Sequence, residues 1–291
     1  MPPFLFDAIL HLLRNETDRY RFAPPIAPKE VFKLKRRTLL GGIALAAISR
    51  GALSAETTEA IKVGSVKIGS GEEQIVWTRH PAKRAGRRPS VILLHGTRGF
   101  ELKPSAYENY ANALTTEGID AYFVHFYTKT DNEKMKAFST KKDREAYDSE
   151  RYVAWTERVS SAITAILEGS DSSDRLGLLG FSLGGFVAAA TAARDSRVAA
   201  LAVLYGGMPG QIAPQVKHMP PVIELHGDAD HNVPLASGEA LVALTKAVGS
   251  PAEQVTYPGK GHGFDFIDND PATSNAVDRV TRFFGVQLGS A

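Results

Sequence analysis

The chain has 291 residues, of which 43% are hydrophobic and 23% charged, a composition typical of a globular domain. It contains no cysteine, which excludes disulfide bonds, thiolate zinc sites and a cysteine nucleophile. The formal net charge of +2 comes from the first 55 residues, since the remainder holds 25 basic and 28 acidic residues. The composition therefore gives no reason to expect binding to nucleic acid.

Residues 35–55 have the pattern of a secretory signal. Arg36 and Arg37 are followed by a short, mildly apolar run over 41–48 and then by small residues. The adjacent arginines and the weak hydrophobicity favour the twin-arginine export machinery. The run of about ten apolar residues is shorter than the roughly 20 that a membrane-spanning helix needs, so we expect no stable membrane span.

We therefore expect two parts in the chain. Residues 1–55 would form an N-terminal extension with a twin-arginine signal, cut after Ala55, and residues 56–291 one folded domain. The protein would then be periplasmic or secreted. The alternative is a cytoplasmic protein with a flexible N-terminal extension.

The first predicted elements of the domain are strands. Residues 61–68 and 73–80 alternate between polar and apolar side chains, which predicts a hairpin that turns at 69–71. Residues 90–94 form a continuous apolar run, as expected of a central strand buried on both faces.

The later chain alternates between helices and strands. We predict helices at 104–117, 152–167, 185–193, 236–248 and 276–284, and strands at 121–126, 175–179, 199–205, 222–226 and 255–257. This alternation predicts one α/β domain with a mostly parallel central sheet and helices on both faces.

Residues 127–150 interrupt the alternation because they are highly charged and show no periodicity. A connection of this length inside a domain predicts a lid, a binding loop or a mobile surface segment. Tyr127 and Tyr147 would either line a substrate pocket or lie at the surface, and surface placement is favoured.

Residues 180–184, Gly-Phe-Ser-Leu-Gly, lie between an apolar strand and an Ala-rich helix. This pattern is typical of a nucleophile elbow, a sharp strand-to-helix turn in which flanking side chains would collide with the backbone. Ser182 is therefore the candidate nucleophile. A serine hydroxyl needs a base, and the base needs an orienting acid; in α/β-hydrolases the chain order is Ser, acid, His.

Candidates for the acid and the base follow in that order. Asp228 and Asp230 both lie on the loop after the 222–226 strand, and we favour Asp230, which precedes His-Asn-Val-Pro, as the acid. His262 is bracketed by glycines after the last predicted strand, which suits a base that reaches toward the serine.

Other histidines at strand ends are given structural roles. His95 and His226 each precede a glycine and are interpreted as packing or loop-fixing residues. A metal site built from His226, Asp228, Asp230 and His231 would lack a zinc-type spacing, so we expect no metal and no cofactor.

Acyl transfer also needs two backbone N–H groups directed at the developing oxyanion. Leu183, directly after the candidate nucleophile, would supply one. The loop at 95–99 would supply the other, for which we choose Thr97. The next residue, Arg98, either holds an acidic group of the substrate or faces solvent.

Residues 62–286 resemble the dienelactone hydrolase family of α/β-hydrolases. The resemblance rests on residues 180–185 (GFSLGG), 205–207 (YGG), 226–234 (HGDADHNVP) and 257–264 (YPGKGHGF). It implies an α/β-hydrolase fold with Ser182 as nucleophile, Asp230 as acid and His262 as base.

The chain departs from the family pattern at two positions. The namesake enzymes have cysteine where this chain has Ser182, and glutamate where it has Gly96. The resemblance therefore implies a serine hydrolase on this scaffold rather than dienelactone as the substrate.

The expected function is the hydrolysis of a carboxylic ester or related acyl bond in a small-molecule substrate. One alternative is a small-substrate serine peptidase of the same fold, since the same triad cleaves amides. Another is a non-catalytic binding protein that retains the fold.

Overall fold

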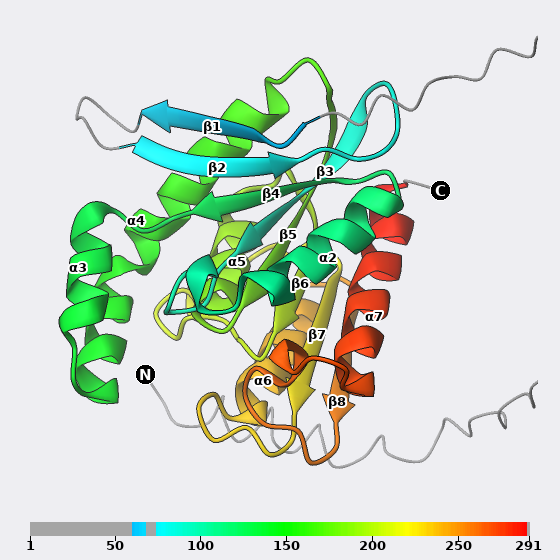
Figure 1. The fold of residues 1–291 in the computed structure, drawn as a ribbon. Helices are drawn as coiled ribbons and strands as arrows, with labels where there is room; N and C mark the ends of the chain where they lie inside the picture. The colour runs from blue at the N-terminus through cyan, green and yellow to red at the C-terminus, as the bar shows by residue number, and fades with distance from the viewer. Residues whose placement is uncertain (1–59, 68–73, 290–291) are drawn as a thin grey trace, which may run out of the picture. The chain divides into compact units, whose positions relative to one another are not determined.

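The computed structural model describes residues 60–67 and 74–289. These residues form an eight-stranded sheet in the order β1-β2-β4-β3-β5-β6-β7-β8 (Figure 1). β2 pairs with β1 and β4 in the antiparallel sense, and all other neighbours are parallel. The strands are β1 (Lys62–Lys67), β2 (Gln74–His80), β3 (Arg88–Leu94), β4 (Asp120–His125), β5 (Ser172–Phe181), β6 (Val198–Leu204), β7 (Val222–Gly227) and β8 (Ala252–Tyr257).

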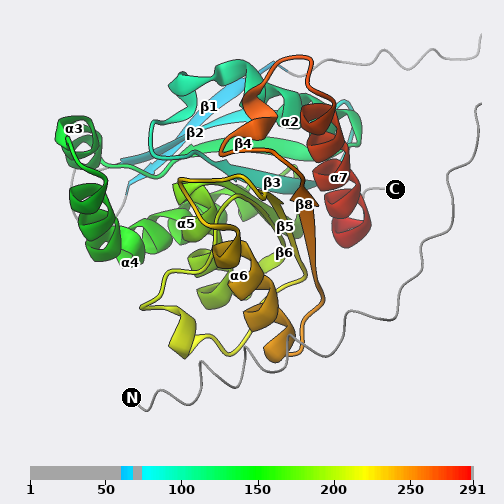
Figure 2. The same ribbon diagram turned by 90° about the horizontal axis from the view of Figure 1, so that it is seen from below.

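Helices cover both faces of this sheet (Figure 2). α2 and α7 bury their apolar side chains on one face, and α4, α5 and α6 bury theirs on the other. The helices are α2 (Pro104–Thr116), α3 (Lys129–Ala137), α4 (Lys141–Leu167), α5 (Leu183–Arg194), α6 (Leu235–Ala247) and α7 (Pro271–Leu288), with short 3-10 turns η1 (Phe100–Leu102), η2 (Ala213–Gln215) and η3 (Phe264–Phe266). The prediction of a mostly parallel sheet covered on both faces is confirmed.

Strand burial follows the apolar pattern of the sequence. Every residue of β3 and of β7 is buried, as expected of strands covered on both faces, whereas β1 is an exposed edge strand. β1 and β2 pair as the predicted hairpin, and its turn lies outside the described residues. The predicted boundary at residue 55 and the signal before it also lie outside them. Within the described ranges no helix has the length and apolarity to cross a membrane.

The prediction of a loop over 127–150 is wrong, because this segment forms α3 and the first part of α4 (Figure 1). Each helix begins at a threonine cap: the hydroxyl of Thr128 accepts the N–H of Asp131, and that of Thr140 accepts the N–H of Asp143. α3 shows no apolar period because its single buried residue is Asp131. The cap pattern, Thr-x-x-Asp, was the signal in the sequence that marks both helix starts.

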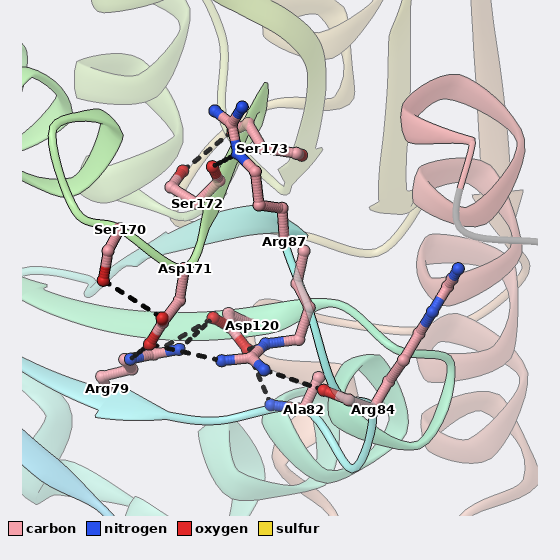
Figure 3. Close-up of polar contacts among 10 residues, drawn as sticks. Arg79, Ala82, Arg84, Arg87, Asp120, Ser170, Asp171, Ser172 and Ser173 are labelled. Carbon is pink, nitrogen blue, oxygen red and sulfur yellow. Dashed lines mark hydrogen bonds and ion pairs between the residues drawn. The ribbon is translucent and has the colours of Figure 1, made fainter.

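A buried ionic cluster lies at the starts of β3, β4 and β5 and at the end of the antiparallel strand β2 (Figure 3). Asp120, wholly buried at the start of β4, accepts hydrogen bonds from Arg79 at 2.8 Å and from Arg88 at 3.0 Å. It also accepts the backbone N–H of Ala82 at 2.7 Å. Asp171, just before β5, accepts a further bond from Arg79 at 3.1 Å.

Replacing Asp120 with alanine should lower the free energy of unfolding by about 3–5 kcal/mol, because two buried guanidinium groups lose their shared acceptor. Denaturant unfolding monitored by circular dichroism measures the change. The matched control is Asp174→Ala, which removes an exposed partner of Arg87 and should change stability little. Equal effects of the two substitutions would contradict a stabilising role for the cluster.

Candidate active site

Ser182 lies on a sharp turn between β5 and α5. Its backbone has φ 53° and ψ −120°, a conformation that non-glycine residues rarely adopt and that is concentrated at functional sites. The flanking glycines are required by close approach. A Cβ at Gly180 would lie 2.3 Å from the carbonyl oxygen of Gly184, and a Cβ at Gly184 would lie 2.2 Å from that of Leu94. The segment therefore has the geometry predicted for a nucleophile elbow.

The structure brings together the three residues proposed from the sequence as nucleophile, base and acid. His262 Nε2 lies 2.9 Å from Ser182 Oγ, and His262 Nδ1 lies 2.7 Å from Asp230 Oδ2. The side chain of Asp230 is fully buried, and that of His262 is 20% exposed. The imidazole can thus contact both partners while one edge remains accessible from the cavity.

The two candidate acids, both on the loop after β7, have different hydrogen-bond partners. Oδ1 of Asp230 accepts the backbone N–H groups of Asn232 and Val233 at 2.7 and 3.0 Å, which leaves Oδ2 for His262. Asp228 is exposed, and its Oδ1 accepts the backbone N–H of Gly259 at 2.6 Å. The geometry thus favours Asp230 over Asp228 as the partner of the imidazole.

The other two histidines singled out are buried. His95 stacks on Phe126 with 4.3 Å between ring centroids, and burial lowers its pKa to about 3, so the ring is neutral. Its Nδ1 lies 2.8 Å from the carbonyl oxygen of Gly96, which fixes the following loop. His226 contacts Glu224 at 2.8 Å. Among the described residues, no group of acids and histidines has the arrangement of a metal site.

Leu183 and Thr97 line the same cavity as Ser182. In the part of the chain that the structure describes, no carbonyl or side chain accepts the backbone N–H of either residue. Two amides without an internal acceptor beside a nucleophile can bind a negatively charged oxygen. Arg98 is exposed at the same cavity.

Tyr127 corrects a prediction of surface placement. It is 6% exposed, lines the cavity, and donates its hydroxyl to the carbonyl oxygen of Thr97 at 3.3 Å. Tyr147 is half-buried and donates its hydroxyl to Asp131 at 2.7 Å. The hydroxyl groups of both tyrosines therefore form hydrogen bonds within the domain.

The cavity has a volume of about 1210 Å³, and α3 and α4 supply one of its walls. Sequence reasoning missed this wall because it lies in the segment predicted as a loop. Its lining residues are Asn132, Met135, Lys136, Phe138, Lys141, Arg144, Glu145, Asp148 and Tyr152. Burial raises the pKa of Asp148 to about 7, so this acid changes its charge near neutral pH.

Two contacts hold this wall to the rest of the domain. Lys141 Nζ donates to the carbonyl oxygen of Asn232 at 2.8 Å, and thus touches the loop that carries Asp230. Gln211 Nε2 donates to the carbonyl oxygen of Ser149 at 2.7 Å. The first of these bonds links the wall directly to the loop that carries the candidate acid.

Comparison with known proteins agrees with this geometry. The model of the dienelactone hydrolase family matches residues 77–288. A protein of Methylorubrum extorquens, named provisionally as a carboxymethylenebutenolidase, is 24% identical over 264 residues, which cover 79% of this chain and 84% of that protein.

Solved structures show the same fold at low sequence identity. Dienelactone hydrolase from Anabaena variabilis is 18% identical with a TM-score of 0.62, over 78% of this chain and 99% of its own. Est1E from Butyrivibrio proteoclasticus is 16% identical with a TM-score of 0.59, over 78% and 99%. The chain has the α/β-hydrolase fold and belongs to the dienelactone hydrolase family.

Proposed function

We propose that the protein is a serine hydrolase that cleaves a carboxylic ester or a related acyl bond in a small molecule. The observation that carries this proposal is the line of contacts from Asp230 through His262 to Ser182, at 2.7 and 2.9 Å. A carboxylate, an imidazole and a hydroxyl in this order are the groups that acyl transfer requires. Membership of a hydrolase family supports the reaction class.

In the proposed reaction, His262 Nε2 takes the proton of Ser182 as Oγ attacks the carbonyl carbon. The N–H groups of Leu183 and Thr97 stabilise the oxyanion. His262 then gives the proton to the leaving oxygen, and an acyl-enzyme remains. Water, deprotonated by His262, hydrolyses it, while Asp230 holds the imidazole in the required tautomer throughout. These steps use only groups of the chain and water.

Labelling with a fluorophosphonate tests the assignment of the nucleophile, since this reagent phosphonylates an activated serine. The wild type should be labelled, and Ser182→Ala should not. An unlabelled wild type, or equal labelling of Ser182→Ala, would contradict the proposal. Faster hydrolysis of short p-nitrophenyl esters than of matched peptide anilides would favour an esterase over a peptidase.

We assign to Arg98 the binding of an acidic group on the substrate, because its exposed guanidinium lies at the rim of the cavity. Arg98→Ala should raise KM for an ester with a free carboxylate by about two- to fivefold, and leave KM for an uncharged ester unchanged. Lys142→Ala, which removes an exposed cation that does not line this cavity, is the control. An equal change for both esters would argue against the assignment.

We also propose that residues 1–55 direct twin-arginine export to the periplasm and precede a mature domain at 56–291. The support is Arg36-Arg37 followed by a short, weakly apolar run. Fractionation of cells that express the double variant Arg36→Lys, Arg37→Lys tests it. Accumulation of the precursor inside the cell is expected, and unchanged export would remove the twin-arginine route.

A further inference from the structure

Two titratable side chains that the proposed reaction does not use lie directly behind Asp230. Glu224 and His226 are two residues apart on β7, so they project to the same face of the sheet, and both are wholly buried. Acidic side chains are seldom fully buried unless they are paired. Glu224 Oε1 lies 2.8 Å from His226 Nδ1, and Oε2 accepts a hydrogen bond from Gln254 at 3.1 Å.

Helix α6 packs directly against Glu224. A Cβ at Gly238 of α6 would lie 2.4 Å from Glu224 Cδ, so the helix backbone rests directly on the carboxyl group. The position of Glu224 is therefore fixed by β7, by Gln254 of β8 and by α6 together. The carboxylate of Glu224 is thus held where its Oε1 lies 2.8 Å from His226 Nδ1.

The contacts of His226 determine which of its nitrogens carries hydrogen. Nε2 lies 3.0 Å from the carbonyl oxygen of Val233, which can only accept, so Nε2 carries a hydrogen. One proton then lies between Nδ1 and Glu224. Burial lowers the pKa of His226, but the hydrogen bond and charge of Glu224 outweigh this and raise it. Wherever that proton resides, the Nε2–H of His226 is retained.

The Nε2–H of His226 lies beside Val233 and Asp230, in the loop after β7. His226 Nε2 lies 3.4 Å from Asp230 Oδ2, the oxygen that also contacts His262 Nδ1. Val233 is held at both ends: its N–H binds Asp230 Oδ1, and its carbonyl oxygen binds His226. One imidazole thus forms a hydrogen bond with the turn that orients Asp230 and lies 3.4 Å from the Asp230 carboxylate.

We propose that Glu224 and His226 are positioning residues, which hold the carboxylate of Asp230 in line with His262 through the Nε2–H of His226. Glu224 orients the imidazole, and the imidazole fixes Asp230 and the 230–233 turn. This inference rests on the proposed function, because it gives the pair a role only through Asp230. Neither residue touches the substrate in this scheme.

Two polar substitutions of His226 separate positioning from simple packing. The amide of His226→Gln reaches the place of Nε2, whereas that of His226→Asn reaches only the place of Nδ1 and satisfies Glu224 alone. His226→Asn should lower kcat for p-nitrophenyl acetate by about 10- to 100-fold with KM unchanged. His226→Gln should keep kcat within about threefold of the wild type. A kcat of His226→Asn equal to that of the wild type would overturn the proposal.

His80→Asn is the matched control. His80 is a half-buried histidine of β2 that packs on Phe123 with 4.5 Å between ring centroids and does not line the cavity. Its substitution should leave kcat unchanged. A similar loss of kcat in this control would show a general effect of removing an imidazole, and would count against positioning.

A double-mutant cycle with Asp230→Asn tests the route of action. If the pair acts through Asp230, His226→Asn should lower kcat little further once Asp230 has been replaced. A full additional loss in that background would overturn the proposal. Fluorophosphonate labelling of the wild type keeps the two failures apart: an unlabelled wild type refutes the proposed function, and a labelled one with an additive cycle refutes positioning alone.

NMR of wild-type protein with 15N-labelled histidine gives a readout that needs no variant to fold. The shift of His226 Nε2 should be that of a protonated nitrogen from about pH 5 to about pH 9. An unprotonated Nε2 anywhere in this range would overturn the proposal, because His226 could then neither donate to the carbonyl oxygen of Val233 nor present a hydrogen to Asp230.

Discussion

Replacing Ser182 with alanine is expected to lower kcat for an ester substrate by about a million-fold. In the proposed reaction, the hydroxyl 2.9 Å from His262 is the attacking group, and no acyl-enzyme can form without it. KM should change little, because the lining of the cavity is kept. The fold should persist, since alanine accepts the same backbone conformation at a similar cost.

The measurement is steady-state hydrolysis of p-nitrophenyl acetate, with the pre-steady-state burst as a second readout. Ser237→Ala is the matched control, because Ser237 lines the same cavity without a contact to His262. It should retain the burst and most of kcat. Activity that survives in Ser182→Ala but is lost in Ser237→Ala would move the nucleophile to Ser237.

Asp230→Asn should lower kcat by about 10⁴-fold. Asn232 and Val233 donate to Oδ1, so the amide oxygen of asparagine takes that place and its NH₂ group faces His262. Nδ1 of His262 must then accept a hydrogen bond, and the proton moves to Nε2. An imidazole in this tautomer cannot take the proton of Ser182.

Asp228→Asn is the comparison that decides between the two candidate acids. Asp228 contacts the backbone of Gly259 on the surface, so its replacement should leave kcat close to that of the wild type. Hydrolysis rates of the two variants, measured with circular dichroism as a check on folding, give the answer. A larger loss for Asp228→Asn than for Asp230→Asn would reverse the assignment.

The positions of the candidate triad could be predicted from the sequence because each residue follows a strand with a clear apolar pattern. Ser182 is marked by glycines that the turn requires, and Asp230 and His262 follow in the order that the fold imposes. Parallel strands end at one edge of the sheet, so short loops after β5, β7 and β8 bring the three together.

The wall of the cavity could not be predicted in the same way. α3 buries only Asp131, whose carboxylate accepts hydrogen bonds from the backbone of Thr128 and from the side chains of Tyr147 and Arg151. None of these contacts produces the apolar period by which helices are recognised. Which residues of this segment line the cavity depends on how α3 and α4 pack in the folded domain.

Glu224 shows a second limit of sequence patterns. A charged residue within an apolar strand gives no indication of its partners. Glu224 contacts Gln254 of the neighbouring strand and His226, two positions further along its own strand. Its burial under Gly238 depends on the path of α6 over the sheet. Only the packed structure shows these contacts together.

The Asp120 cluster and the candidate triad lie at opposite edges of the parallel sheet, one at strand starts and the other beyond strand ends. Free-energy changes at such distant sites without shared partners usually add. Substitutions that reshape the cavity at the expense of stability can therefore be combined with stabilising changes near strand starts, without interference between the two. This separation should let the domain tolerate substitutions of residues that line the cavity.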